Sequence, residues 1–322
     1  MFFRFSLFLA LSCTTTFGVV TLENADSLWK FDGADSGTAS NGQIVDATGN
    51  HVAINAARLS WNTTVPANSP AGGWPVDTIG RALSFDPYVT IAGAGTSDDT
   101  VAAAAFQVAN GTVSGNFSVL TRWNWAGPLP GADGVTPNDL PTNSWLLNNG
   151  LGGSGIGFLF GILGNSDGET AKLAYYTSSG GSFSGTRTKT STLSFAKDTW
   201  YDVGIVVDMG DGDASTIADN SVTFYLFGPD GLQTETYTGM YISDATTTAP
   251  NTTLTVGSES SGTGSSNQRK TFNGSLDYLA IFDESMSQEE VLAIFAAPEP
   301  GRVMLSLLGF LGLIVCRRRT RV

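Results

Sequence analysis

The sequence predicts an all-β domain, folded either as a closed barrel or as a two-sheet sandwich. Three observations support this prediction. Hydrophobic residues alternate with other residues in many short segments, Gly, Asn, Asp and Pro fill the stretches between them, and only 14% of the 322 residues are charged. Abundant Gly, Ser, Thr and Asn with few charges is typical of secreted β-rich domains rather than of helical ones.

Period-two patterns identify the expected strands. In four segments the alternate residues fall on one face of a strand, and we expect each such face to meet a core. The four sets are Phe85, Pro87, Val89 and Ile91; Phe117, Val119, Trp123 and Trp125; Ile156, Phe158, Phe160 and Ile162; and Val222, Phe224 and Leu226. Trp29 and Trp200 also lie in strand-like segments, and we expect both to be core residues.

One helix is expected near the end of the domain. The segment SQEEVLAIF begins with Ser287, and Glu290 follows three residues later, which is the arrangement of a capping box. Val291, Leu292 and Phe295 then form an apolar stripe suited to docking on a sheet. No repeat or linker divides residues 19–297, so we expect one domain of roughly a dozen strands, a length within the range of single all-β domains.

Both ends of the sequence are expected to be targeting segments. Residues 1–18 combine an early Arg4, an apolar stretch and small residues near the end, as in a secretory signal peptide. Residues 303–315 are nearly all apolar and precede four arginines. This length is marginal for a transmembrane helix, and the arginines would remain on the cytoplasmic side. We therefore expect export, with a core helix as the alternative for 303–315.

The segment from 298 to 322 resembles the PEP-CTERM sorting signal of Gram-negative bacteria. Pro298, Glu299 and Pro300 match its triplet, and a short hydrophobic helix and a basic terminus follow in the same order. The resemblance implies recognition by an exosortase, a membrane protease or transpeptidase that removes the tail after a transient stay in the inner membrane. It also implies a final place at the cell surface or in the extracellular matrix.

Removal of both ends changes the composition. Cys13 and Cys316 lie in the removed segments, so residues 19–297 have no thiol for a disulfide, a metal or a nucleophile. The ends also carry six of the 16 basic residues but one of the 29 acidic ones, which leaves 10 basic against 28 acidic residues and a net charge of −18. This charge argues against binding nucleic acid, whose phosphates require a basic surface.

The order of several segments resembles the laminin-G-like branch of the concanavalin A-like lectin/glucanase superfamily. The matching segments are LWKFDG (28–33), DATGNH (46–51), GRALSFDPYVTI (80–91), NFSVLTRWNW (116–125), KDTWYDVGIVVDM (197–209), VTFYLFGPDG (222–231) and FNGSLDYLAIFDESMSQEEVLAIF (272–295). The resemblance spans about residues 22–296 and implies a jelly-roll sandwich of two antiparallel sheets, one of them concave. Trp200-Tyr201-Asp202 stands where the family often has Trp-His-His, and stretches 92–115 and 126–152 have the character of inserted loops.

Residues suited to catalysis are scarce. Glycanases of this superfamily use a Glu-x-Asp-x-Glu strand, and retaining hydrolysis needs two carboxylates about 5 to 5.5 Å apart. That pattern does not occur here, and the adjacent Glu289 and Glu290 belong to the expected helix. His51, the single histidine, lies in a turn-like segment. We therefore expect a non-catalytic domain.

Three aspartates form the candidate metal site. Asp208, Asp211 and Asp213 follow a strand in a Gly-containing turn. Calcium prefers clustered carboxylate and carbonyl oxygens, and a turn of this kind can supply them. We expect weak calcium binding here, with a solvated acidic turn as the alternative.

Three tryptophans form the candidate ligand site. Lectin-like sites use aromatic rings for the faces of sugars, and amides or carboxylates for their hydroxyl groups. Trp61, Trp74 and Trp145 lie among Asn, Gly and Pro residues, where exposure is expected. These residues are therefore the candidates for contact with a glycan.

Three functions remain open at this point. The first is an exported surface or matrix protein that binds carbohydrate, such as an exopolysaccharide, or serves as a structural element. The second is a polysaccharide hydrolase or lyase on the same fold, which the missing carboxylate pair disfavours. The third is a protein-binding adhesin.

The calcium hypothesis predicts a difference in thermal stability. Calcium that binds the folded chain raises its melting temperature, so the protein should melt at a higher temperature in calcium than in chelator. Equal melting temperatures in the two solutions would refute the hypothesis.

Overall fold

The structure is a computed structural model, and it describes thirteen stretches of the chain. These are residues 20–31, 37–62, 81–85, 88–90, 100–102, 105–109, 115–128, 143–149, 157–178, 187–210, 217–242, 253–258 and 271–296. The expected signal peptide, the Pro298-Glu299-Pro300 triplet and the apolar segment 303–315 lie outside them. Within these stretches, no helix has the length and apolar character that a membrane crossing requires.

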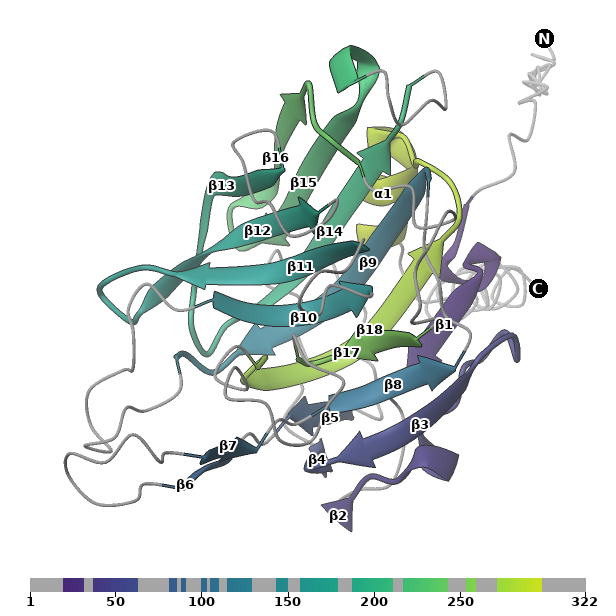
Figure 1. Ribbon diagram of the computed structural model, residues 1–322, viewed down its shortest axis with the longest axis vertical. Helices are drawn as coiled ribbons and strands as arrows, with labels where there is room; N and C mark the ends of the chain where they lie inside the picture. The colour runs from purple at the N-terminus through teal and green to yellow at the C-terminus, as the bar shows by residue number, and fades with distance from the viewer. Residues whose placement is uncertain are drawn as a thin grey trace, which may run out of the picture.

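Two antiparallel sheets form the layers of a β-sandwich (Figure 1). Sheet A has the order β16–β15–β14–β9–β18–β5–β4–β2, with β1 also paired to β18, and sheet B has the order β13–β12–β11–β10–β17–β8–β3. The strands of sheet A are β1 (Ser27–Lys30), β2 (Gly37–Thr38), β4 (Leu59–Asn62), β5 (Ala82–Phe85), β9 (Phe117–Trp125), β14 (Trp200–Asp208), β15 (Ser221–Gly228), β16 (Gly231–Thr238) and β18 (Gly274–Phe282). Those of sheet B are β3 (Val52–Ala57), β8 (Ala105–Ala109), β10 (Asn143–Asn149), β11 (Gly157–Gly164), β12 (Thr170–Ser178), β13 (Thr188–Ala196) and β17 (Thr253–Val256). The expected all-β fold is thus confirmed, and the sandwich is the form it takes.

The core lies between the two sheets and is rich in aromatic rings. Phe117 of β9 stacks on Phe158 of β11 with ring centroids 4.8 Å apart, and Trp123 stacks on Phe160 at 6.1 Å. The alternate residues expected to face a core in β9, β11 and β15 all do so, wherever the structure describes them. Burial of such large side chains is the main favourable contribution to folding.

Two expectations about strands are wrong. The segment from Phe85 to Ile91 is divided, because β5 ends at Phe85 and Tyr88–Thr90 forms β6, which pairs with β7 (Thr100–Ala102) in a separate small sheet. Pro87 lies between them, and proline has no N–H to donate to a ladder. The stretches 92–115 and 126–152, expected to be inserted loops, contribute β8 and β10 to sheet B.

The C-terminal helix α1 (Gln288–Phe295) covers part of sheet A on the side away from sheet B. The Ser287 hydroxyl accepts a hydrogen bond from the Glu290 N–H at 3.3 Å, and the Glu290 carboxylate accepts one from the Ser287 N–H at 2.8 Å, so the capping box is confirmed. Val291, Ile294 and Phe295 are buried against the sheet, whereas Leu292 is 38% exposed. The expected stripe was therefore wrong at Leu292, because positions i, i+3 and i+4 share a helix face and i+1 does not.

The edge strands of the two sheets are joined by a hydrogen-bonded clasp. The Glu235 carboxylate on β16 accepts hydrogen bonds from the N–H of Thr192 on β13 at 2.5 Å and from the Thr192 hydroxyl at 3.1 Å. The Tyr237 hydroxyl donates to Glu235 at 2.7 Å and lies 3.0 Å from the Thr190 carbonyl oxygen. These contacts cross from sheet A to sheet B and close one side of the sandwich.

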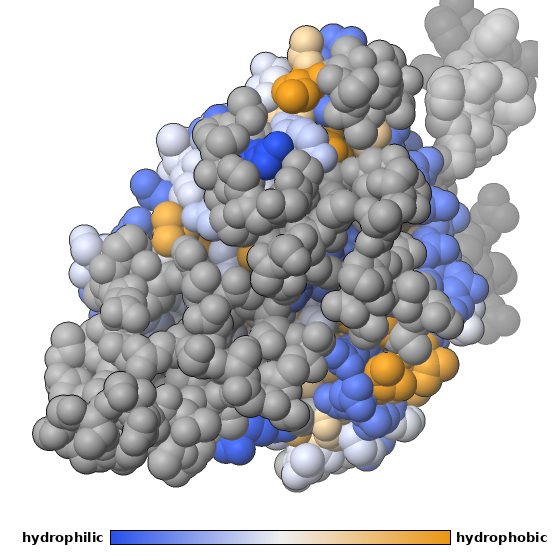
Figure 2. All heavy atoms as spheres, in the orientation of Figure 1, coloured by the Kyte–Doolittle hydropathy of each residue, from blue (hydrophilic) through white to orange (hydrophobic). Residues whose placement is uncertain are grey.

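Exposed large apolar side chains are few in the described part of the chain, although two of them, Val45 and Val52, pair across an isolated β-bridge. The large ones are Val45, Val52, Ile217 and Leu292. On the face drawn in Figure 2, the orange atoms form small separate groups among hydrophilic residues. Because apolar docking surfaces are usually contiguous, polar groups are the better place to look for a binding site.

The clasp predicts a measurable loss of stability on substitution. Glu235→Ala removes the acceptor shared by Thr192 and Tyr237, and should lower the free energy of unfolding by about 1 to 2 kcal/mol. Chemical denaturation of the full chain measures this. Thr234→Ala, at an exposed neighbouring position on β16, serves as the control and should change stability by less than about 0.5 kcal/mol. Equal effects of the two substitutions would contradict the role of the clasp.

Candidate functional site

A row of polar side chains crosses the outer face of sheet A. Strand register places Ser84 of β5 opposite Ser275 of β18, Ser275 opposite Asn124 of β9, and Asn124 opposite Trp200 of β14. Their chain neighbours, among them Leu83, Trp123 and Tyr201, pack in the core. Since successive side chains of a strand point to opposite faces, the row lies on the side of sheet A away from sheet B.

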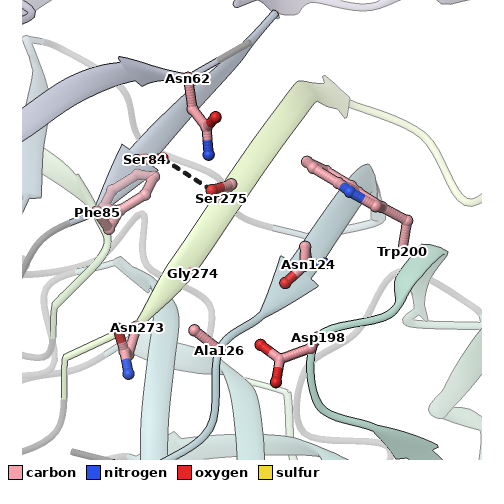
Figure 3. Close-up of a pocket in the computed structure, with 10 residues that line it drawn as sticks. All are labelled: Asn62, Ser84, Phe85, Asn124, Ala126, Asp198, Trp200, Asn273, Gly274 and Ser275. Carbon is pink, nitrogen blue, oxygen red and sulfur yellow. Dashed lines mark hydrogen bonds between the residues drawn. The ribbon is translucent and has the colours of Figure 1, made fainter. Parts of the chain in front are cut away.

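This row lines a pocket of about 300 Å³ (Figure 3). The volume is at the small end of the range for ligand sites. Ser84 and Ser275 are joined by a hydrogen bond between their hydroxyl groups at 2.8 Å. The remaining described lining residues are Asn62, Phe85, Ala126, Asp198, Asn273 and Gly274. The pocket is thus lined chiefly by amide, hydroxyl and carboxylate groups, with the Trp200 ring at one end.

The floor of the pocket depends on a close approach between β18 and β9. A Cβ atom at Gly274 would lie 2.1 Å from the Asn124 carbonyl oxygen, so no other residue fits there without a backbone shift. The neighbouring Asn273 amide donates a hydrogen bond to the Gly127 carbonyl oxygen at 3.0 Å. The glycine therefore keeps the strands close, and Asn273 fixes the adjoining rim.

Asp198 holds an unusual backbone conformation at the rim. Its φ is +56°, a left-handed value that aspartate tolerates better than most residues. Its N–H donates to the carbonyl oxygen of the buried Trp125 at 2.7 Å, which ties the turn before β14 to β9. The Asp198 and Asn124 side chains make no hydrogen bond within the described stretches, so their polar atoms are available to a ligand.

Trp200 is buried as predicted, but it lies on the outer face of sheet A and not between the sheets. It is 7% exposed and lines the pocket, whereas the next residue, Tyr201, packs between the sheets. In Figure 3 its ring extends from β14 toward Ser275. The sequence carried a signal for this position, because Trp200 is in phase with Asp202 rather than with Val203 and Ile205.

A buried charge cluster occupies the next row of the same face. The Arg122 guanidinium on β9 donates to Asp202 on β14 at 3.2 Å and to Asp277 on β18 at 3.0 Å, and the Tyr278 hydroxyl donates to Asp202 at 3.1 Å. The register of β18 against β9 shifts between Leu276 and Tyr278, which identifies a β-bulge at Asp277. The bulge places both Asp277 and Tyr278 near Arg122.

Electrostatics in this cluster favour a proton on Asp202. Burial raises the pKa of Asp202 to about 7, although Arg122 and Tyr278 oppose the shift. Desolvation acts against the charge on Arg122, but attraction to Asp202 and Asp277 raises the pKa of the guanidinium above its ordinary value. One cation thus faces two carboxylates in a largely buried site, and among the described residues nothing hydrogen-bonds to the second oxygen of Asp202. Protonation of Asp202 leaves a neutral Arg122–Asp277 pair, which is the cheaper buried state.

The expected exposure of the candidate tryptophans is wrong where the structure tests it. Trp61 on β4 is 5% exposed and packs in the core, and Trp145 on β10 is fully buried against Leu159 and Tyr176. Trp74 lies outside the described stretches. The Asn residues around Trp145 suggested a loop, but Asn148 and Asn149 are themselves buried strand residues. Neither Trp61 nor Trp145 can stack on a sugar in this structure.

The calcium hypothesis remains a prediction. Asp208 is the last residue of β14, and its carboxylate accepts a hydrogen bond from the Gly210 N–H at 2.9 Å. Asp211 and Asp213 lie outside the described stretches. Among the residues that are described, no three His, Cys, Asp or Glu side chains gather closely enough to hold a metal ion.

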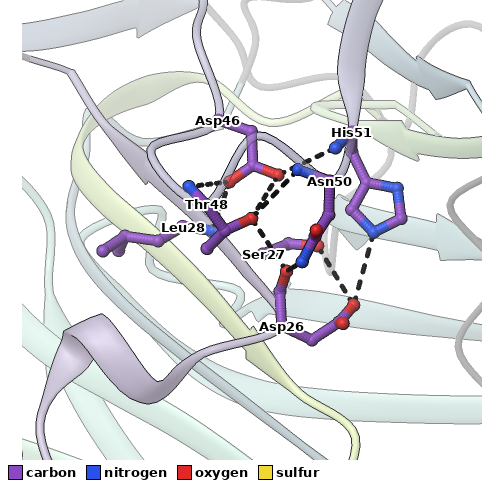
Figure 4. A network of polar contacts seen from close by, with 7 residues as sticks. All are labelled: Asp26, Ser27, Leu28, Asp46, Thr48, Asn50 and His51. Carbon is purple, nitrogen blue, oxygen red and sulfur yellow. Dashed lines mark hydrogen bonds and ion pairs between the residues drawn. The ribbon is translucent and has the colours of Figure 1, made fainter.

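A second polar network surrounds Asp46 and has a structural role (Figure 4). The buried carboxylate accepts hydrogen bonds from the N–H groups of Leu28, Thr48 and His51 and from the Thr48 hydroxyl, at 2.8 to 3.0 Å. His51 also lies 3.3 Å from the Asp26 carboxylate through Nε2. Because four donors already occupy the two oxygens of Asp46, it fixes this turn against β1 and leaves little capacity for a ligand.

Comparisons with known proteins identify no family. No family model and no curated protein matches the sequence. Similar solved structures include the CBM40 module of Ruminococcus gnavus IT-sialidase bound to α2,3-sialyllactose (12% identity, 57% of this chain and 83% of that chain, TM-score 0.34), the PL-14 alginate lyase of Aplysia kurodai (13%, 63% and 83%, 0.33) and the binding domain of botulinum neurotoxin serotype C1 (11%, 84% and 51%, 0.39). At these identities and TM-scores, they carry no argument about ligand or activity.

The charge cluster predicts a pH dependence of stability. In the unfolded chain the Asp202 carboxyl group ionises at about pH 4, whereas in the folded protein it keeps its proton up to about pH 7. Its contribution to stability is therefore full below about pH 4 and falls as pH rises to about 7. The contributions of the other titrating groups cancel when the free energies of unfolding of wild type and Asp202→Asn are subtracted. Relative to the variant, wild type should lose up to about 4 kcal/mol between pH 4 and pH 8, measured by chemical denaturation.

The control for this experiment is Asp283→Asn, at an exposed position just after β18. This control should follow wild type at every pH, because its side chain is not in the buried cluster. A constant difference between wild type and Asp202→Asn across the pH range would contradict the presence of a proton on Asp202.

Proposed function

We propose that this protein is an exported carbohydrate-binding protein and that the pocket on the outer face of sheet A binds a sugar. The observation that carries the proposal is the in-register row of Ser84, Ser275, Asn124 and Trp200. Sugars present hydroxyl groups that hydrogen-bond to amides, hydroxyls and carboxylates, and apolar ring faces that pack on aromatic side chains. The row offers hydroxyl and amide groups along one line, and it ends at Trp200, which lines the pocket although it is only 7% exposed.

The rigidity of the site also supports binding. The lining groups stand on neighbouring strands of one sheet, and Ser84 and Ser275 hold each other by a hydrogen bond. A preformed site loses little conformational freedom when it binds a ligand. The buried Arg122 cluster joins β9, β14 and β18 in the next row of the same face. A small, polar and preorganised pocket suits one sugar unit of a larger chain.

The proposed role is non-catalytic. Retaining and inverting glycosidases use two carboxyl groups that flank the bond to be cleaved. Asp198 is the one carboxylate among the described lining residues. Asp202 and Asp277 belong to the charge cluster and are buried beside Arg122. This arrangement favours recognition over hydrolysis.

The proposal includes membership of the laminin-G-like branch with a jelly-roll topology, which the segment order and the two antiparallel sheets support. The proposal includes export by a signal peptide and sorting of residues 298–322 by an exosortase in a Gram-negative bacterium. It also includes a final place at the cell surface or in an exopolysaccharide matrix, which would supply the glycan. Calcium at Asp208, Asp211 and Asp213 would stabilise a turn at the far end of β14 from the pocket.

Substitution in the pocket should weaken glycan binding without unfolding the protein. Asn124→Ala removes an amide that has no described partner, and should reduce retention of the full chain on immobilised exopolysaccharide roughly tenfold, the value of one or two lost hydrogen bonds. Gln288→Ala, an exposed amide on α1, is the matched control and should bind as wild type does. Equal retention of both variants would place the glycan elsewhere, and no retention of wild type on a broad set of polysaccharides would refute carbohydrate binding.

A further inference from the structure

We propose that the pocket prefers a sugar that carries a free, protonated amine and that Asp198 is the residue that selects it. This inference rests on the proposed carbohydrate-binding function and adds the chemical class of the ligand. It comes from the charges in and around the pocket, from the fixed position of Asp198, and from the groups that remain to bind the sugar hydroxyls.

The pocket is electronegative. Its ten described lining residues include Asp198 and no Lys, Arg or His. The two cations nearest in the chain both have carboxylate partners. Lys197 donates to Glu169 at 2.8 Å and also feels the charge of Asp198, and Arg122 donates to Asp202 and Asp277. A uronate or another acidic sugar would bring a negative charge toward Asp198, and no cation stands among the described lining residues to receive it. An ammonium group would meet a carboxylate acceptor instead.

The position of Asp198 is set by its backbone. The hydrogen bond from its N–H to Trp125 and its left-handed φ hold the turn against the end of β9. In Figure 3 the carboxylate stands at the rim next to Ala126, on the same side of the pocket as Asn124. A sugar ring placed over Asn124 and Ser275 would therefore present one substituent to Asp198.

The division of tasks among the side chains follows from this geometry. Asn124, Ser275 and Ser84 offer neutral donors and acceptors that suit hydroxyl groups. Asp198 offers a charge-assisted hydrogen bond, which is stronger than a neutral one for an ammonium donor. Because Asp198 is exposed to solvent, its contribution is that of a surface charge pair, so it sets preference among sugars rather than overall affinity.

The test compares three tetrasaccharide probes on the full chain by isothermal titration calorimetry. The probes are the glucosamine tetramer, its fully N-acetylated counterpart and the galacturonic acid tetramer, at about pH 6, where an amine of this kind is protonated. The glucosamine tetramer should bind wild type roughly threefold to fivefold more tightly than the acetylated one, the range of an exposed charge pair. The galacturonate tetramer should bind most weakly.

Asp198→Asn isolates the contribution of the carboxylate. Asparagine accepts a positive φ as readily as aspartate, so the turn is retained while the charge is lost. The variant should bind the glucosamine tetramer roughly threefold to fivefold less tightly than wild type and bind the acetylated tetramer unchanged. Asp230→Asn, in the exposed turn between β15 and β16, is the matched control and should behave as wild type does.

The outcomes separate the two proposals. If Asp198→Asn leaves glucosamine binding unchanged, or if wild type binds the galacturonate tetramer most tightly, the amine preference is wrong while carbohydrate binding stands. If wild type binds none of the probes and no other saccharide, the proposed function itself fails. Loss of the wild-type preference for glucosamine at high salt is a further expected result, because exposed charge pairs are screened by salt.

Discussion

The β-bulge at Asp277 decides what the outer face of sheet A presents. Before the bulge, Ser275 points outward and Leu276 points into the core; after it, Tyr278, Ala280 and Phe282 point outward while Leu279 and Ile281 point inward. Without the bulge, strict alternation would put Leu279 and Ile281 on the same face as Ser275. Either the pocket or the docking surface for α1 would then be lost. The bulge therefore allows β18 to contribute both to the pocket and to the docking surface for α1.

The outer face of sheet A consequently changes character along its strands. Beneath α1 it is apolar, with Leu120, Val206 and Phe282 packed against the helix. In the next rows it holds the Arg122 cluster, and beyond that the polar pocket. The buried cluster is costly unless its charges are matched, and a proton on Asp202 provides the match. Its stabilising contacts link β9, β14 and β18, which are the strands that carry Asn124, Trp200 and Ser275.

Much of the fold follows from the sequence, whereas the site does not. Strands such as β9 and β15 have one buried face, so period-two alternation identifies them and their inward residues. β18 is buried throughout, because one face meets the core and the other is covered in turn by the pocket side chains, the Arg122 cluster and α1. Its largely hydrophobic run therefore hides the bulge. Trp61 and Trp145 show that local composition can mislead. Their polar neighbours predicted exposed loops, but both are buried residues of strands. The pocket is lined by residues from five strands that are separated in the chain. The pairing register of these strands brings the residues together, and the sequence pattern does not reveal that register.

The most direct test of the account uses the indole N–H resonances of the seven tryptophans in a two-dimensional NMR spectrum of the full chain. Trp200 lines the pocket, whereas Trp29, Trp123 and Trp125 are sealed in the core. Titration with a sugar that binds should shift the Trp200 indole signal and leave those three unchanged. A saturating ligand that leaves Trp200 unmoved, or that shifts only Trp61, Trp74 or Trp145, would show that the glycan binds elsewhere.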